Sequence, residues 1–196
     1  MLFNVPNLIT IGRILVIPIL AVLLHRLNGA DLTADKSLSF WAMILFAVAG
    51  ISDLVDGYYA RKYGQVSVMG KFFDPMADKL IHMTAMIFLI PLGRITAWLT
   101  CVILCREIFI TGLRSMAAGE GIIIDAGSWG KKKTAFFNIG LSALILHHNV
   151  FPGTFFQINT VFIAMVCMYA GLFMSVLSGV EYTVVFFNRM KGQVKS

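Results

Sequence analysis

Four aspartates stand at helical spacing inside segments that are otherwise apolar. They form two pairs, and the four residues are Asp53, Asp56, Asp74 and Asp78. The members of a pair are three or four residues apart, so each pair lies on one face of a helix. An ionised carboxylate in a bilayer is costly unless a partner, water or a metal ion compensates its charge. The spacing therefore predicts two helices that together hold four carboxylates around divalent cations.

Such a set of acids suits phosphoryl transfer assisted by two metal ions. Carboxylate oxygens are hard ligands, which favour Mg²⁺ or Mn²⁺ over zinc. Two cations about 3.5–4 Å apart clamp a phosphoryl group and stabilise both the attacking and the leaving oxygen. If the acceptor is an alcohol, one carboxylate must also take the proton of the attacking hydroxyl. The small residues Gly57, Ala60 and Gly70 leave room beside the acids for a bulky ligand or a facing backbone.

Basic residues lie near the acids or follow later in the chain. Arg61 directly follows the first acid pair and would lie near the charged end of a ligand. Arg106, Arg114 and Lys133 could hold a second, anionic substrate through charge-assisted hydrogen bonds.

The composition determines the class of protein that carries these residues. The chain has 196 residues, of which 58% are hydrophobic and 13% charged, whereas a soluble domain is about 45–50% apolar and about 25% charged. We therefore predict an all-α polytopic membrane protein with six transmembrane helices of about 20 residues in a single domain, residues 1–196. The net charge of +6 is explained by basic residues at the inner membrane face, so we expect no nucleic-acid partner.

The predicted spans place the acids at one membrane face. A short interfacial segment, residues 1–9, precedes spans at 10–27, 38–60, 72–92, 95–116, 134–150 and 157–187. With the N-terminus inside, thirteen of the sixteen Lys and Arg residues lie towards the inner side. The second span ends and the third begins at that side, so the acids lie near the cytoplasmic boundary. Arg13 and Arg26 lie near the two ends of the first span and can snorkel towards the head groups.

The acidic stretch resembles the signature of the CDP-alcohol phosphotransferases. The matching positions are Asp53, Asp56, Gly57, Ala60, Arg61, Gly70, Asp74 and Asp78. Residues 4–13, 74–79, 106–114 and 130–134 are similar to the branch of that family that makes phosphatidylglycerophosphate in bacteria. The resemblance covers most of the chain and implies transfer of a phosphatidyl group from CDP-diacylglycerol to sn-glycerol 3-phosphate, with release of CMP.

The resemblance also implies a role for each matching residue. Two Mg²⁺ or Mn²⁺ ions would be bound by Asp53, Asp56, Asp74 and Asp78, and Asp78 would also be the catalytic base. CDP-diacylglycerol would be bound by Asp53, Gly57, Ala60, Arg61 and Gly70. The phosphate of glycerol 3-phosphate would be held by Arg106, Arg114 and Lys133, which the signature itself does not include. A homodimer among membrane lipids, in the bacterial cytoplasmic (inner) membrane with its active site facing the cytoplasm, is the implied setting.

Other interpretations stay open at this point. Within the family, the acceptor could be inositol phosphate or phosphatidylglycerol. In a different class, the acids could form the transport site of an ion transporter, although the sequence has no internal repeat of the kind that transporters show. Structural interpretations compete as well: ion pairs of the acids with Arg61 and Lys79, a pair of Arg106 with Glu107, and membrane anchoring by the lysines at 131–133.

Overall fold

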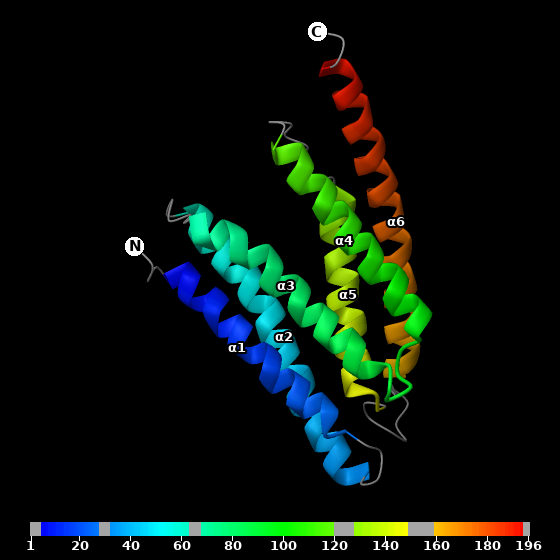
Figure 1. Ribbon diagram of the computed structural model, residues 1–196. Helices are drawn as coiled ribbons and strands as arrows, with labels where there is room; N and C mark the ends of the chain where they lie inside the picture. The colour runs from blue at the N-terminus through cyan, green and yellow to red at the C-terminus, as the bar shows by residue number, and fades with distance from the viewer. Residues whose placement is uncertain (1–4, 28–31, 63–67, 120–127, 149–158, 194–196) are drawn as a thin grey trace. The chain divides into compact units, whose positions relative to one another are not determined.

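A computed structural model describes residues 5–27, 32–62, 68–119, 128–148 and 159–193. Within the helices, the side chains of 5–10, 32–34, 53–62, 68–75, 128, 129, 131 and 191–193 lie outside this description. The helices are α1 (Val5–His25), α2 (Leu32–Lys62), α3 (Val68–Leu89), α4 (Ala97–Gly119), α5 (Ser128–Leu146) and α6 (Thr160–Gln193) (Figure 1). The described part of the chain is all-helical with six helices, which confirms the predicted fold class.

The helices extend further into the polar segments than the apolar runs predict. Val5, Leu32, Val68 and Ser128 begin α1, α2, α3 and α5, each several residues before the predicted span. At the other end of the chain, α6 continues to Gln193, past the predicted end at 187. Hydropathy identifies residues suited to lipid, whereas the start of a helix depends on local interactions. For example, Asp35 lies in the first turn of α2, where its negative charge complements the helix dipole.

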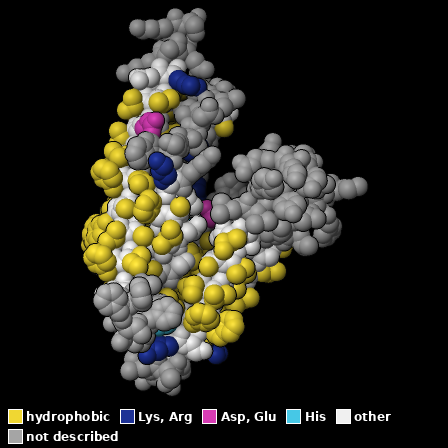
Figure 2. All heavy atoms as spheres, turned by 180° about the vertical axis from the view of Figure 1, so that it is seen from behind, with side chains coloured by type: hydrophobic (Ala, Val, Ile, Leu, Met, Phe, Trp, Pro, Cys, Tyr) yellow, Lys and Arg dark blue, Asp and Glu magenta, His cyan; other side chains and the backbone are white. Residues whose placement is uncertain are grey.

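Large hydrophobic side chains are exposed on every helix. Those with more than half of their surface exposed include Leu15, Trp41, Ile87, Ile108, Ile139 and Phe162. Figure 2 shows hydrophobic side chains over much of the visible surface of the described residues. Among these residues, two stretches are long and apolar enough to cross a membrane, Asp35–Ser52 and Thr160–Met190. Soluble proteins rarely expose so much apolar surface, so the structure is consistent with a membrane protein.

The chain forms two compact units, and unit 1 comprises Met1–Ile95 and Leu141–Ala164. In unit 1, α1 packs against both α2 and α3. Small and large side chains alternate on the buried faces of α2 and α3; they include Ala42, Phe46, Ala49, Ala77, Ile81, Ala85 and Met86. The alanines allow these helices to approach closely, so the three helices that precede residue 95 form one packed layer of unit 1.

The turn after α3 positions Arg94 between other helices of unit 1. Gly93 has a φ of 67°, and the N–H groups of Gly93 and Arg94 donate back to the last turn of α3 in a Schellman motif. The Arg94 guanidinium donates to Ser39 Oγ of α2 at 3.3 Å and to the Ile145 carbonyl at the end of α5 at 2.5 Å. One side chain thus joins the start of α2 to the end of α5.

Unit 2 comprises Thr96–Gly140 and Met165–Ser196. Within unit 2, α5 and α6 approach closely at two glycines. A Cβ atom at Gly140 would lie 3.0 Å from Met168 Sδ, and one at Gly171 would lie 2.7 Å from the Phe137 ring. A hydrophobic cluster joins α4 to α6 and consists of Ile110, Leu113, Ala117, Tyr182 and Phe186. Small residues at the α5–α6 contact and large ones at the α4–α6 contact therefore set the packing of unit 2.

We expect Gly171→Ala to lower the stability of unit 2 by about 1–3 kcal/mol, because the added methyl group overpacks the buried Phe137 ring. Gly112→Ala in α4 is the matched control, since a Cβ atom there has no neighbour within 4 Å. This control is expected to stabilise the helix by about 0.5–1 kcal/mol. Thermal unfolding in detergent micelles measures both, and a shift of the same sign in the two variants would contradict the packing assignment.

Candidate active site

The acid-bearing segments of α2 and α3 lie at one level of unit 1. The two helices run in opposite directions, and the rings of Phe46 and His82 meet with centroids 5.6 Å apart. Asp53 lies seven residues beyond Phe46 and Asp74 eight residues before His82, which is about 10–12 Å along each helix. The two acid pairs therefore lie at a similar level along α2 and α3.

Most of the predicted metal and donor-binding residues have side chains outside the described set. These residues are Asp53, Asp56, Gly57, Ala60 and Arg61 on α2, and Gly70 and Asp74 on α3. Among the described side chains, no group of three His, Cys, Asp or Glu residues could hold a metal ion, and Asp78 is the one predicted ligand within that set. The two-metal site and the CDP-diacylglycerol site therefore stay predictions.

Asp78 is described and has a histidine as its neighbour one helical turn away. Its side chain is 27% exposed, and His82 Nδ1 lies 3.8 Å from its carboxylate oxygen Oδ1. The same Nδ1 lies 2.6 Å from the Asp78 backbone carbonyl; because a carbonyl only accepts, His82 carries its proton there. A half-buried carboxylate of this kind can accept a proton or bind a hard cation. Sequence reasoning missed this contact, although the i,i+4 spacing of His82 from Asp78 indicated it.

Two of the three predicted acceptor-binding residues meet at a shared acid in unit 2. Glu107 Oε1 accepts from Arg106 Nη1 at 2.9 Å and from Lys133 Nζ at 2.6 Å. Arg106 and Glu107 lie on α4 and Lys133 on α5, and the Lys133 side chain is only 11% exposed. The pair of Arg106 with Glu107 is thus present, and Lys133 is a buried partner in this cluster instead of an exposed membrane anchor.

Helix α6 completes the surroundings of Arg106. The second terminal nitrogen of Arg106, Nη2, donates to Ser178 Oγ of α6 at 2.6 Å. A Cβ atom at Gly179 would lie 3.1 Å from Arg106 Nε, so the glycine makes space for the guanidinium. Nε is buried and has no hydrogen-bond partner among the described residues. Sequence reasoning missed Ser178 and Gly179, because two small residues in an apolar run are ordinary in a membrane helix.

Arg114 is the third predicted acceptor-binding residue and lies on α4, two turns beyond Arg106. It is exposed, with its guanidinium carbon 5.4 Å from the centroid of the Tyr182 ring, a cation–π contact. Its charge acts on both Arg106 and Lys133. Three bases and Glu107 leave this cluster with a net charge of +2. That charge suits a phosphate monoester, which carries about −1.5 to −2 at neutral pH.

A cavity of about 560 Å³ lies at the other end of unit 1. It is lined where α1 and α3 end and α2 begins, by residues that include His25, Asp35, Phe88 and Arg94. None of the predicted site residues lines it. Size alone therefore does not identify the active site, and the chemistry of the side chains carries more weight.

Known proteins match this chain over nearly its whole length. The family model for CDP-alcohol phosphatidyltransferase matches residues 3–177. A CDP-diacylglycerol–glycerol-3-phosphate 3-phosphatidyltransferase of Bacillus subtilis (strain 168) is 40% identical over 92% of this chain and 94% of the relative. An enzyme of the same name from Haemophilus influenzae is 30% identical over 94% of each chain. A probable phosphatidylglycerophosphate synthase of Mycobacterium tuberculosis is 34% identical over 91% of this chain and 79% of the relative.

Proposed function

This chain belongs to the CDP-alcohol phosphatidyltransferase family, and we propose that it is the member that converts CDP-diacylglycerol and sn-glycerol 3-phosphate to phosphatidylglycerophosphate and CMP. The observation that carries this proposal is the shared name of relatives that are 30–40% identical over more than 90% of this chain. The described residues fit it, because Asp78 suits the base and the unit 2 cluster suits an acceptor phosphate.

The reaction forms one phosphorus–oxygen bond and breaks another. A glycerol hydroxyl oxygen attacks the phosphorus that bears diacylglycerol, and the bond from that phosphorus to the bridging oxygen of CMP breaks. Asp78 takes the hydroxyl proton, and CMP leaves with the bond's electron pair. The half-exposed carboxylate of Asp78 is accessible to such a hydroxyl.

The four acids together are proposed to act on the diphosphate of CDP-diacylglycerol. Asp53, Asp56, Asp74 and Asp78 would hold two divalent ions, Mg²⁺ or Mn²⁺, which would neutralise charge on the phosphates. Gly57, Ala60 and Gly70 would let the cytidine and diphosphate approach the helices, and Arg61 would contact the diphosphate. This assignment is supported by the common level of the acid-bearing backbone segments in unit 1.

The basic cluster of unit 2 is proposed to bind the phosphate of glycerol 3-phosphate. Arg106 and Lys133 are held by Glu107, which fixes their direction while leaving a net positive charge. The exposed guanidinium of Arg114 is a donor for phosphate oxygens, and the charges of Arg106 and Lys133 add to the positive field around it. A phosphate monoester matches the net charge of +2 better than the single negative charge of a phosphodiester does, which disfavours phosphatidylglycerol as acceptor.

The setting of the reaction follows from the lipid substrate. We propose a multi-pass protein of the bacterial cytoplasmic membrane, with its active site facing the cytoplasm, where soluble glycerol 3-phosphate is available. The excess of Lys and Arg residues on the predicted inner side supports this orientation. Homodimer formation through exposed apolar helix faces is part of the same proposal.

The test is CMP release by the purified full-length chain in detergent micelles. CDP-diacylglycerol is supplied with Mg²⁺ or Mn²⁺ and one acceptor at a time: sn-glycerol 3-phosphate, inositol phosphate, phosphatidylglycerol or none. We expect release with glycerol 3-phosphate that chelation by EDTA abolishes. Release with a different acceptor only, or none with any acceptor, would overturn the proposed substrate pair.

Within this assay, Arg114→Ala is expected to raise the KM for glycerol 3-phosphate about tenfold or more while changing the KM for CDP-diacylglycerol less than twofold. The reason is the loss of a charge-assisted hydrogen bond to the acceptor phosphate, which is worth about 1.5–3 kcal/mol. Arg189→Ala, which removes an exposed arginine from α6 of the same unit, is the control. Equal changes in both KM values would count against the acceptor role.

A further inference from the structure

Arg13 is buried inside unit 1, although the sequence predicted that it would snorkel to the membrane surface. Only 3% of its surface is exposed. It shares one face of α1 with Leu20 and Leu24, which are also buried. Since α1 packs against α2 and α3, this face is the one that contacts them. An arginine stays protonated in proteins, so a buried one needs negative charge nearby.

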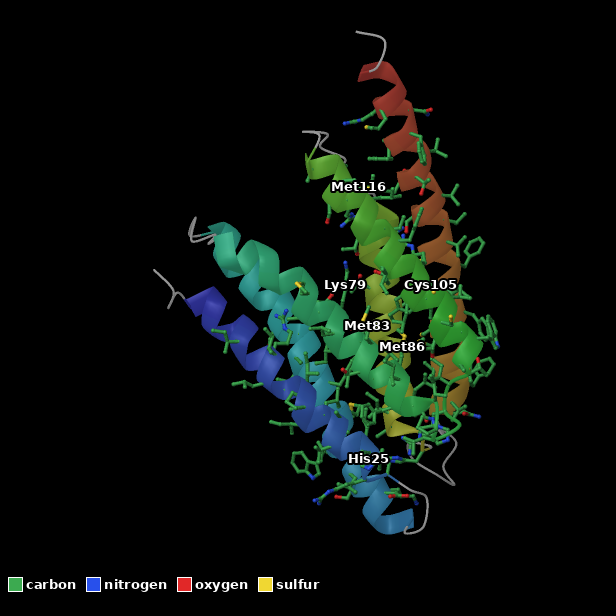
Figure 3. The ribbon with its side chains drawn as sticks, viewed as in Figure 1. His25, Lys79, Met83, Met86, Cys105 and Met116 are labelled. Atoms are coloured by element: carbon green, nitrogen blue, oxygen red, sulfur yellow. The ribbon has the colours of Figure 1, made fainter. Side chains whose placement is uncertain are left out.

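The level of Arg13 along the helices can be obtained from a ring contact. His25 of α1 meets Phe88 of α3 with centroids 6.3 Å apart. The two helices run in the same direction, and Figure 3 shows His25 towards the end of α1 and Met86 towards the end of α3. Arg13 lies twelve residues before His25, which is about 18 Å along the helix. On α3, the position twelve residues before Phe88 is residue 76. Arg13 therefore lies level with the stretch between Asp74 and Asp78.

The acids of unit 1 leave few candidates for the compensating charge. Residues 1–95 and 141–164 contain six acidic residues: Asp31, Asp35, Asp53, Asp56, Asp74 and Asp78. Asp31 lies outside the described residues, and Asp35 lies in the first turn of α2, beside the cavity that His25 also lines, at the far end of unit 1. The four remaining acids are those of the proposed metal site, on the two helices against which α1 packs.

We propose that Arg13 is a positioning residue of the acid site, whose guanidinium on α1 is the buried counter-charge of the aspartates on α2 and α3. This proposal rests on the proposed function of those aspartates. Four carboxylates at one level repel one another, and a fixed cation among them lowers that repulsion before divalent ions bind. The same positive charge opposes the binding of cations, so Arg13 limits metal affinity while it stabilises the metal-free protein.

The test compares Arg13→Gln, Arg13→Lys and the wild type as full-length proteins in detergent micelles without substrates. Thermal unfolding is followed in EDTA and in Mn²⁺, and Mn²⁺ binding is measured by electron paramagnetic resonance. We expect Arg13→Gln to lower the unfolding temperature in EDTA, to at least double the increase that Mn²⁺ produces, and to tighten Mn²⁺ binding about tenfold. Arg13→Lys keeps the charge and is expected to stay close to the wild type.

Arg26→Gln is the matched control, because Arg26 follows the same helix but is exposed; it is expected to change none of these quantities. A purely structural role for Arg13 would lower the unfolding temperature equally in EDTA and Mn²⁺, and that result would overturn the proposal. Weaker Mn²⁺ binding by Arg13→Gln would overturn it as well.

The combination Arg13→Gln with Asp53→Asn removes one charge of each sign and provides a second test if the single variant fails to fold. We expect the double variant to fold in EDTA, without bound metal. If it does not fold there, Arg13 is not the counter-charge of the aspartates. A wild type whose unfolding temperature does not respond to Mn²⁺ would instead reject the metal site of the proposed function. The double variant in EDTA still tests Arg13 in that case, so the two failures are distinguishable.

Discussion

Asp78→Asn is expected to reduce CMP release at least about 10³-fold while the helix content stays unchanged, because loss of a general base alone costs about 10²–10⁴-fold. The neutral amide neither accepts the hydroxyl proton nor offers the charged ligand that a divalent ion prefers. The side chain is partly exposed and the change is isosteric, so little stability should be lost. Initial rates of CMP release at saturating substrate concentrations, together with circular dichroism, measure both parts of this expectation.

Asp35→Asn is the control for this experiment. Asp35 is also a partly buried acid of unit 1, but it lies in the first turn of α2 and lines the cavity at the other end of the unit. Its loss is expected to leave turnover within about twofold of the wild type, since surface changes away from the site have small effects. Turnover of Asp78→Asn at the wild-type rate would remove Asp78 from the mechanism.

Glu107→Gln is expected to destabilise the protein by about 3–5 kcal/mol, because it leaves two buried cations without their shared acid. Both Arg106 and Lys133 donate to the same oxygen of Glu107, so the change removes the negative charge from two hydrogen bonds at once. The unfolding free energy in mixed micelles is the measurement. Glu181→Gln, an exposed acid on α6 of the same unit, is the control and is expected to shift this free energy by less than about 0.5 kcal/mol.

A triple replacement separates the structural role of this cluster from its proposed role in binding. Replacing Arg106, Glu107 and Lys133 together by methionine removes the buried charges as a set, and such replacements are often neutral or stabilising. We expect this variant to regain stability but not affinity for glycerol 3-phosphate. A stable triple variant with an unchanged KM for the acceptor would show that the cluster serves folding alone.

The class of fold follows directly from composition, and the placement of two of the acids on one helix follows from their spacing. Long apolar runs with few charges predicted six helices, and the described residues form six. The i,i+4 spacing placed Asp78 on one face of a helix with Asp74, and the structure confirms that both lie on α3. These features depend on residues close together in the chain, where helix geometry applies without tertiary information.

Contacts between distant segments could not be predicted in this way. Glu107 and Lys133 are 26 residues apart, and Arg106 and Ser178 are 72 apart, so only the packing of three helices brings them together. Arg13 was misplaced for a related reason. An arginine near the end of an apolar helix can either extend its side chain to the membrane surface or bury it between helices. Which of the two occurs depends on its neighbours on other helices.

The contact between Arg94 and the end of α5 imposes an order on the assembly of unit 1. The first 95 residues emerge from the ribosome before residues 141–164, yet both belong to the same unit. Until α5 has been inserted, the guanidinium of Arg94 lacks the carbonyl groups of Leu144 and Ile145. A nascent chain halted before residue 141 would therefore expose an incomplete helix layer in which Arg94 lacks these two acceptors, and such exposed partial folds are prone to misassembly.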